Sequence, residues 1–319
     1  MENVKDTYIN ALNEHKEKYP KLKTKALIKK LRDKKVSFDI IDELQAEKNL
    51  DDLNYYYKLT VYKRNFQKNS EGEYINLDFS YLCDIASVDM QLRYILAQFT
   101  MDIEHSLKTL LMKKITYNDE LDGYDIIESF LQSTENTNKP ISNEDLFKKS
   151  SHITNYQYRM SETHKHCPPV WVVLEVLSFG ELTNLFLYYF KRFPESSYEV
   201  KSMAGLLAGA KRIRNMSVHN TPFLFDLDQN EIKSINNYLF QYVTEQNIPK
   251  RIYKKSKIHD VFCVIYLHKK LVNGTGSREY RIKDIADLTD RSLTRFSYLS
   301  SKNMITQFFK HLKIIIENY

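Results

Sequence analysis

The sequence predicts a mainly α-helical protein, built as a multi-helix bundle with short connecting loops. Only 7 glycines and 7 prolines occur among 319 residues, so residues that interrupt helices are rare. Apolar residues recur at three- and four-residue spacings over several long stretches, which is the period of an amphipathic helix. The length suits one large or two medium domains.

Composition limits the class of protein. The chain has 47 Lys and Arg against 41 Asp and Glu, and a formal net charge of +6 permits an RNA partner at a local patch without requiring one. The three cysteines lie far apart and predict free thiols in a reducing compartment. Residues 1–20 lack the apolar core of a signal peptide, and no apolar run reaches roughly 18 residues, so we expect a cytoplasmic protein without a membrane segment.

The N-terminal region predicts short helices with many lysines. Residues 1–19 form an amphipathic lead-in that ends at Pro20, and Thr24 is placed to cap a helix running to Leu31. Apolar residues at 40–44 predict a second short helix. The lysines form either a solvated face or a contact to an RNA backbone; they are Lys21, Lys23, Lys25, Lys29, Lys30, Lys34 and Lys35.

Aromatic and basic residues alternate along residues 55–66. Lys58, Lys63 and Arg64 stand among the tyrosines, and aromatic side chains among cations can stack bases and hold phosphates. Aromatic runs more often build a core, so the segment is either an RNA contact or core, and we favour core. The polar residues 68–73 that follow predict a turn.

Residues 79–115 carry the strongest helical pattern and predict one long core helix. Glu104 stands among apolar neighbours there, one turn before Lys108, which is the spacing of an ion pair within a helix. The apolar residues that define the pattern are Leu92, Ile95, Leu96, Phe99, Ile103, Leu107, Leu110 and Leu111.

The next segment, residues 117–165, is polar and predicts one short helix at 126–131 among loops and short turns. His164, His166 and Cys167 raise the question of zinc. Three ligands within four residues do not close a tetrahedral site by themselves, and no second Cys/His pair stands nearby. We therefore expect no metal site.

Residues 168–190 predict one helix placed centrally in the bundle, because apolar residues occupy nearly every face. Gly180 is expected to end or kink this helix. Glu175 is either a surface residue on the one open face or a buried carboxylate paired with an arginine, for which Arg214 is the candidate.

The most distinctive stretch runs from Val200 to Asn220 and reads VKSMAGLLAGAKRIRNMSVHN. Its small residues predict a helix that a second backbone approaches closely, either the preceding helix or another copy of the protein. Its end carries Arg214, Asn215 and His219 in the pattern R-N-x-x-x-H. The pattern is short enough to arise by chance, in which case it marks an exposed basic helix with one histidine.

Arginine and histidine in this pattern suit the cleavage of a phosphodiester. Histidine can pass protons near neutral pH, and a guanidinium presents a planar fork of donors to phosphate oxygens. His219 would take the proton from a ribose 2′-hydroxyl, and Arg214 would neutralise charge on the phosphate. This route needs no metal and no cofactor. Arg212, seven residues before His219, is expected on the same helical stripe and is a candidate RNA contact.

Residues 226–319 predict a helical C-terminal extension packed on a core formed by residues 1–225. Helices are expected at 232–243, 261–267 and 308–316, with a flexible turn at 273–277. A basic run in this extension is either a solvated linker or a second contact to an RNA backbone; it comprises Lys250, Arg251, Lys254, Lys255 and Lys257.

Several blocks occur in the order seen in AbiD/AbiF-like abortive-infection proteins, a family of bacterial phage-resistance proteins that this chain resembles from about Lys21 to Pro222. The most specific block contains the tryptophan, a glutamate and Ser-Phe-Gly. The blocks are Tyr55-Tyr-Tyr-Lys-Leu-Thr-Val-Tyr62, Asp89-Met-Gln-Leu-Arg93, Asp102-Ile-Glu-His-Ser-Leu-Lys108, Pro169-Val-Trp-Val-Val-Leu-Glu-Val-Leu-Ser-Phe-Gly180, and Arg214 to His219.

The resemblance implies a helical domain of the HEPN type (higher eukaryotes and prokaryotes nucleotide-binding), whose Arg-x4-His motif is similar to that of metal-independent endoribonucleases. It implies that Arg214, Asn215 and His219 form the catalytic centre and that Glu104 or Glu175 orients the arginine or the histidine. The products would be a 2′,3′-cyclic phosphate and a 5′-hydroxyl. HEPN nucleases pair two motifs, which implies a homodimer, and some members of the family resemble toxins restrained by a small RNA.

The chain departs from its relatives at two places. Many relatives read Ala-His-His after the Arg-Asn pair, where this chain has Val218, His219 and Asn220, so the role of a second histidine is absent. The Leu-Ser-Gly-Tyr of relatives appears as Leu59-Thr-Val-Tyr62. An alternative function is a non-catalytic RNA-binding or interaction module, which would keep the arginine for phosphate contact and would not need His219.

Overall fold

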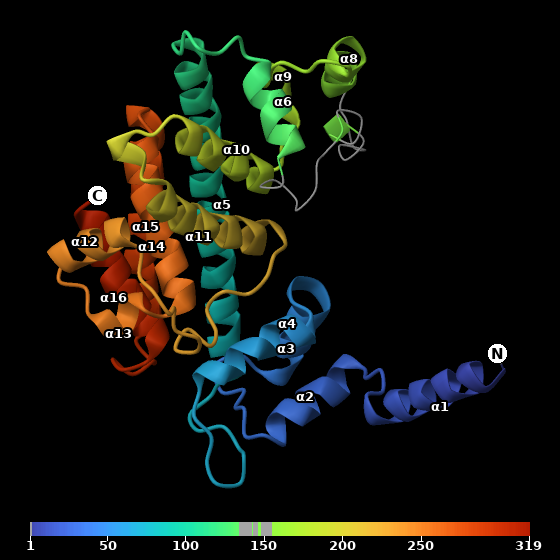
Figure 1. Ribbon diagram of the computed structural model, residues 1–319. Helices are drawn as coiled ribbons and strands as arrows, with labels where there is room; N and C mark the ends of the chain where they lie inside the picture. The colour runs from blue at the N-terminus through green and yellow to red at the C-terminus, as the bar shows by residue number, and fades with distance from the viewer. Residues whose placement is uncertain (1, 134–141, 143–145, 148–154) are drawn as a thin grey trace. The chain divides into compact units, whose positions relative to one another are not determined.

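Helices are the only regular secondary structure among the residues described by the computed structural model (Figure 1). This confirms the mainly α-helical class predicted from the sequence. No helix in the described ranges is both long enough and apolar enough to cross a membrane. The described residues are 2–133, 142, 146–147 and 155–319.

The first of two compact units comprises the residues up to Ser87 together with Leu224–Asp226. Its buried side chains include Leu31, Leu59 and Tyr62. The unit is built from short helices: α1 (Glu2–Lys18), α2 (Thr24–Arg32), α3 (Glu43–Lys48), a π-helical turn (Asn49–Leu53), α4 (Tyr56–Leu59), a 3₁₀ helix (Thr60–Asn65) and the first turns of α5 (Phe79–Thr116).

The first unit differs from expectation at two helix starts. Thr24 is the first residue of α2 and not its cap, because Lys23 holds the cap position and the hydroxyl of Thr24 donates to Asp51 at 2.5 Å. The second short helix begins later than expected, at Glu43, because the side chain of Asp42 caps it there.

The expectation of an aromatic core at 55–66 is wrong for two of its tyrosines. Tyr55 is 63% exposed and Tyr57 is 85% exposed, whereas Leu59 and Tyr62 are buried. The helix α4 is a single turn, so neighbouring side chains point to different faces and only some of them reach the interior.

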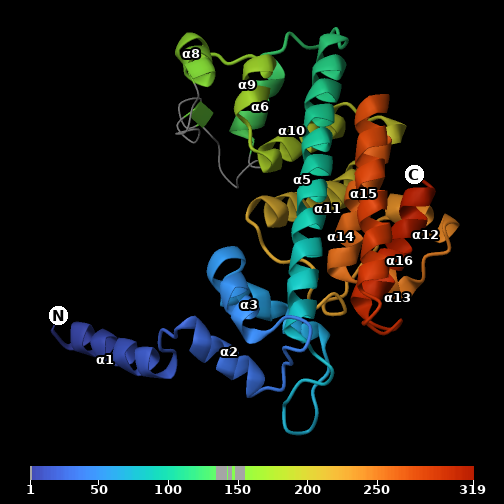
Figure 2. The same cartoon turned by 180° about the vertical axis from the view of Figure 1, so that it is seen from behind.

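The second unit comprises Val88–Phe223 and Leu227–Tyr319. It contains the rest of α5, then α6 (Asp125–Gln132), α8 (Asn155–His164), α9 (Val170–Val176), α10 (Phe179–Arg192), a 3₁₀ turn (Ser196–Tyr198), α11 (Val200–Val218), α12 (Asn237–Glu245), α13 (Lys250–Tyr253), α14 (Ser256–Leu271), α15 (Thr275–Arg295) and α16 (Met304–Glu317). Figures 1 and 2 show α14, α15 and α16 on one side of α5, and α6 and α9 on the other.

The helices predicted at 79–115 and 126–131 are present as α5 and α6. On α5 the buried side chains recur every three or four residues, as the sequence pattern requires. All four apolar residues of α6 are buried, namely Ile126, Ile127, Phe130 and Leu131.

The small residues of α11 serve packing within the chain. A β-carbon on Gly209 would lie 3.0 Å from Cβ of Cys263, so the missing side chain lets α11 and α14 approach closely. A β-carbon on Gly205 would likewise lie 3.0 Å from the amide nitrogen of Asn236. The close neighbour of this helix is therefore α14, together with the segment that precedes α12.

The single helix expected at 168–190 is in fact two helices, α9 and α10. Ser178 and Glu181 start α10 with a capping box, in which the Ser178 hydroxyl accepts from the Glu181 N–H at 3.3 Å and the Glu181 carboxylate accepts from the Ser178 N–H at 2.9 Å. Gly180 lies inside the first turn of α10 and does not cause the break.

Two helices, α8 and α15, lie where loops or a turn were expected. α15 begins inside the turn predicted at 273–277 and runs for 21 residues. Its sequence is polar, and its buried residues Ile285 and Leu288 lie in a helix that packs against α16. Such a helix is stabilised by packing against its neighbour more than by its own apolar pattern.

Candidate functional site

The motif residues lie at the C-terminal end of α11. His219 is the residue that caps the helix, and its backbone N–H donates to the carbonyl of Asn215 at 2.9 Å. Arg214 and Asn215 are half-buried, whereas Val218 and His219 are exposed. Five residues of helix correspond to a rise of about 7.5 Å and a rotation of about 140°, so the two side chains leave the helix in different directions.

The side chains of Arg214 and His219 are available to a ligand. Within the part of the chain that the structure describes, neither the guanidinium nor the imidazole has a hydrogen bond or an ion pair. A guanidinium carries five donors in a planar fork, and an imidazole both donates and accepts. The end of α11 therefore presents a cation and an acid–base group that no other described residue pairs with.

A buried polar cluster holds the chain where it leaves α11. Nε of Arg93 donates to the Asp89 carboxylate at 2.8 Å, and these side chains are 2% and 0% exposed. The other oxygen of Asp89 accepts from the backbone N–H of Phe223 at 2.7 Å. Nη1 of Arg93 donates to the side-chain oxygen of Asn220. We refer to Asp89, Arg93, Asn220 and Phe223 as the buried clamp, after its buried ion pair; Asn220 itself is exposed.

The buried clamp fixes the backbone next to the motif histidine. Asn220 has a φ of 56°, in the left-handed region that asparagine adopts more readily than most residues. The N–H of the next residue, Thr221, donates back to the carbonyl of Met216 at 2.9 Å. The direction in which the chain leaves α11 beside His219 is therefore set by contacts with the core of α5.

Arg212 is held by α14. Its Nε and Nη2 atoms each lie 2.6 Å from a different oxygen of Asp260, which is a bidentate pair with a carboxylate only 6% exposed. Hydrogen bonding to Asp260 raises the pKa of Arg212. This arginine, expected on the stripe of His219, thus links α11 to α14 in this structure.

Neither candidate orienting carboxylate contacts Arg214 among the described residues. Oε1 of Glu104 lies 3.7 Å from Nζ of Lys108, the intrahelical pair that the spacing favours. Glu104 lies three turns, or about 16 Å of helical rise, beyond Arg93 on α5. Glu175 lies on α9 and is exposed, which matches the surface alternative for this residue.

Two basic residues of the first unit, Lys63 and Arg64, pack against aromatic or acidic side chains. Nζ of Lys63 lies 5.7 Å from the ring centre of Tyr56 and 5.8 Å from that of Tyr74, and burial lowers the pKa of this lysine. Arg64 pairs with Asp226 at 2.7 Å. The RNA-contact candidates of this unit are Lys58, Lys63 and Arg64.

The basic run before α14 is partly paired. Lys255 lies 3.0 Å from the Glu231 carboxylate, and Arg251 donates to Gln307 at 3.1 Å. Lys250 and Lys254 have no ion-pair partner in the described ranges. The RNA-contact candidates of the second unit are Lys250, Arg251, Lys254 and Lys255, together with Arg212.

Two features near the motif escaped prediction from the sequence. Asp89 and Arg93 stand four residues apart, which signals an intrahelical pair, but their link to Asn220 spans 127 residues and no local pattern reveals it. Lys211 precedes the motif arginine by three residues and so lies on the same side of α11. A β-carbon on Gly180 would lie 2.8 Å from Nζ of Lys211, so this glycine leaves room for the lysine.

No three His, Cys, Asp or Glu side chains among the described residues are placed to hold a metal ion. His166 and Cys167 are exposed at the end of the segment that follows α8. The exposed end of α11 thus combines an imidazole, a guanidinium and a nearby ammonium group. These are the groups that bind a phosphate and move a proton.

Comparison with known proteins places the motif in a family. The model of a family described as "Abi-like protein" matches residues 48–224. This range includes α11 with its motif and every residue of the buried clamp, and it ends one residue after Phe223. No curated protein matches the chain, and no solved structure matches it.

Proposed function

The chain belongs to the Abi-like protein family, a family of abortive-infection proteins, and from this premise we propose that it is a metal-independent endoribonuclease of anti-phage defence. The observation that carries the proposal is the pair of side chains, Arg214 and His219, that have no partner among the described residues and lie on a helix end that the buried clamp holds in place. A catalytic pair needs this combination of free functional groups and a rigid support.

In the proposed reaction, His219 takes the proton of a ribose 2′-hydroxyl, and the resulting oxygen attacks the adjacent phosphorus. The bond from phosphorus to the 5′-oxygen breaks, and that oxygen receives a proton from a histidine or from water. The products are a 2′,3′-cyclic phosphate and a 5′-hydroxyl. Arg214 stabilises the negative charge that builds on the phosphate oxygens, and Lys211 adds positive charge on the same side of the helix.

Three further residues have supporting roles in this proposal. Asn215, half-buried beside Arg214, is a hydrogen-bonding group that orients the substrate phosphate. Glu104 and Glu175 do not contact Arg214 within the described part of the chain, and their proposed role is to orient the motif of a neighbouring chain. The buried clamp supplies support of another kind, because it positions the backbone that carries His219.

The proposal includes a homodimer with a composite site, because each chain has one motif and the reaction benefits from a second acid–base group. It also includes RNA as both substrate and regulator, with a small RNA able to restrain the protein. Light scattering on the purified protein measures the first point. Full activity in a strictly monomeric protein would contradict the composite site.

The deciding experiment compares wild type with His219→Ala on labelled RNA in the presence of EDTA. Loss of a general acid–base group is expected to reduce cleavage by about 10²–10⁴-fold. His15→Ala is the matched control, since His15 is also exposed but lies on α1. Retention of RNA binding with loss of cutting supports the nuclease.

Two results would count against the nuclease. Equal cutting by His219→Ala and wild type would remove His219 from the mechanism. RNA binding without cutting, in protein stripped of co-purified RNA, would favour the non-catalytic RNA-binding module. The absorbance ratio at 260 and 280 nm shows whether RNA co-purifies and identifies protein that must be stripped before the assay.

A further inference from the structure

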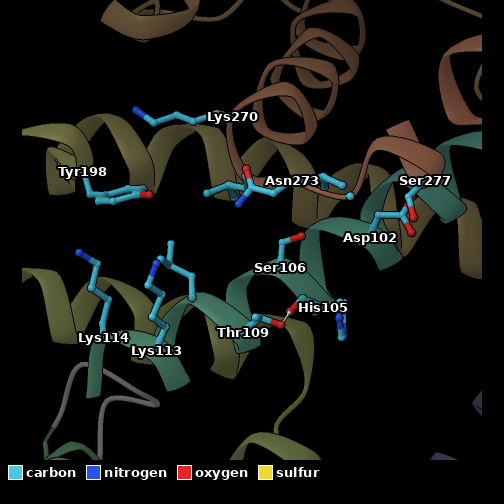
Figure 3. Close-up of a pocket in the computed structure, with 14 residues that line it drawn as sticks. Asp102, His105, Ser106, Thr109, Lys113, Lys114, Tyr198, Lys270, Asn273 and Ser277 are labelled. Carbon is cyan, nitrogen blue, oxygen red and sulfur yellow. Dashed lines mark hydrogen bonds between the residues drawn. The ribbon is translucent and has the colours of Figure 1, made fainter. Parts of the chain in front are cut away.

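A cleft of about 550 Å³ lies in the second unit, far from the motif. Figure 3 shows it between α5, the 3₁₀ turn that ends at Tyr198, the end of α14 and the start of α15. Tyr198 precedes α11 and His219 follows it, so the cleft and the motif lie at opposite ends of that helix, about 30 Å apart by helical rise. The cleft is therefore a separate site from the proposed cleavage centre.

Three lysines from two helices give the cleft a positive end. Lys113 and Lys114 come from α5 and Lys270 from α14, and Figure 3 shows them around the ring of Tyr198. Asp102 is the only carboxylate among the lining residues that the structure describes. The lining residues therefore carry more positive than negative charge.

Existing contacts leave part of this charge available. Lys114 pairs with Glu195 at 2.7 Å, and Lys270 donates one of its hydrogens to the carbonyl of Ser197 at 2.7 Å. Lys113 has neither an ion pair nor a hydrogen bond from its ammonium group within the described ranges. An ammonium group has three donors, so Lys270 also keeps donors for a ligand.

The carboxylate at the other end of the cleft is already neutralised. Oδ2 of Asp102 lies 2.9 Å from Nε of Arg281 and 3.3 Å from Nε2 of His268. It therefore does not compete for the lysines or repel an anion strongly.

The start of α15 adds donors to the same cleft. Gly274 holds the N-cap position without a side-chain hydrogen bond, and the first turn contains no acidic residue. Gly274 and Ser277 line the cleft, so the unsatisfied backbone N–H groups of this first turn are close to it. Such groups favour anions, and here they reinforce the three lysines.

We propose that this cleft binds the phosphate of a nucleotide, either as a free nucleotide or as part of RNA. Ammonium groups bind phosphate as point charges, and Lys113 and Lys270 keep donors for the phosphate oxygens of a nucleotide or of an RNA backbone. Ser106, Thr109 and Asn273 supply hydroxyl and amide groups that match a ribose and a base edge. The volume lies in the range of small-molecule sites.

The test measures binding of two probes to the full-length protein after removal of co-purified nucleic acid. The probes are ADP and a fluorescein-labelled 2′-O-methyl RNA decamer, which lacks the 2′-hydroxyl nucleophile and stays intact. Lys113→Glu is the main variant, because Lys113 is exposed and we expect its replacement to leave the fold in place. We expect it to weaken binding of at least one probe by about tenfold, equivalent to about 1.4 kcal/mol.

A second variant and a control test whether the effect of Lys113→Glu arises in the cleft. Thr109→Glu places a carboxylate in the cleft from another position on α5 and should weaken the same probe. Lys310→Glu makes the same charge change on the exposed side of α16 and should leave binding as in wild type.

The outcomes separate the two sources of phosphate. Loss of ADP binding alone assigns the cleft to a free nucleotide, and loss of decamer binding alone assigns it to the RNA backbone. Wild-type protein that binds neither probe, or a Lys113→Glu protein that binds both as wild type does, would overturn the proposal. Because binding and not cleavage is measured, the result stands whether or not the protein is a ribonuclease.

Discussion

Two arginines near the end of α11 lie in opposite surroundings. Arg93 is 2% exposed and bonded to Asp89 and Asn220, whereas Arg214 is half-buried and has no partner among the described residues. A buried charge must be paired to be tolerated at all, so the surroundings of Arg93 indicate a structural role. A guanidinium left unpaired at the surface is available for a ligand. The buried clamp thus serves stability, and the exposed motif beside it serves the proposed chemistry.

The largest expected effect comes from breaking the buried clamp. Arg93→Met leaves the Asp89 carboxylate buried without its guanidinium, which should cost about 3–5 kcal/mol of unfolding free energy. Arg214→Met is the matched substitution, and it should change stability by no more than about 0.5 kcal/mol. Urea unfolding followed by circular dichroism measures both. Similar losses in the two variants would erase the distinction between the two arginines.

The second prediction concerns activity and sharpens the same comparison. Arg214→Ala should lower the rate of RNA cleavage by about 10²–10³-fold, because charge on the phosphate is no longer neutralised. Arg214→Lys should recover part of the rate, since it keeps the charge but lacks the planar fork. Single-turnover cleavage of labelled RNA measures the rates. Arg192→Ala, at an exposed position on α10, is the control and should cut as wild type does.

The contrast also shows what the sequence could predict. The helices α5 and α6 were predictable because their buried residues recur every three or four positions. α15 was not, because its polar sequence begins with Thr-Gly-Ser277 directly after Gly274, and its stability depends on α16. The break between α9 and α10 carried a readable signal, the Ser178-x-x-Glu181 capping box, within an apolar run that concealed it.

Some parts of the candidate site could likewise be predicted from the sequence, and others depend on the folded structure. The motif was visible in the sequence because Arg214, Asn215 and His219 are close along the chain. The buried clamp joins Arg93 to a residue 127 positions away, and only the folded chain brings them together. Arg212 has the spacing of a motif neighbour, yet its bidentate pair with Asp260 depends on α14. Local patterns reveal candidate chemistry, and long-range packing decides which groups are left free.

The third prediction tests the connection between the clamp and the motif. Asn220→Gly keeps the left-handed backbone accessible but removes the oxygen that accepts from Arg93, which should cost about 1–3 kcal/mol. Asn220→Ala loses the same bond and adds about 1–2 kcal/mol for a left-handed φ. Urea unfolding of the two variants separates the contributions. Equal stability of the two would show that the backbone at this position relaxes.

The smallest expected effect extends the comparison to two histidines, the exposed His219 and the buried His268. Nδ1 of His268 lies 2.6 Å from the hydroxyl of Tyr319 and Nε2 lies 3.3 Å from Asp102, which fits a neutral ring that accepts at one nitrogen and donates at the other. Burial lowers the pKa of His268, and the hydrogen bond with Asp102 only partly offsets this.

The sign of the pH dependence follows from this shift. The unfolded chain takes up a proton on this histidine near the ordinary pKa of 6.5, whereas the folded chain does so only at lower pH. The contribution of His268 to stability is therefore complete above about pH 6.5 and is lost as the pH falls from there through the lowered pKa of the folded state. The urea concentration at the unfolding midpoint should decrease as the pH is lowered from about 7.5 to about 5.5.

Two variants test this assignment. His268→Gln should flatten the pH dependence of the midpoint. His219→Ala should have the wild-type midpoint at about pH 7.5 but should lose activity. A dependence that His268→Gln leaves unchanged would assign the pH sensitivity to other groups, of which His311 is the first to test, because burial lowers its pKa as well.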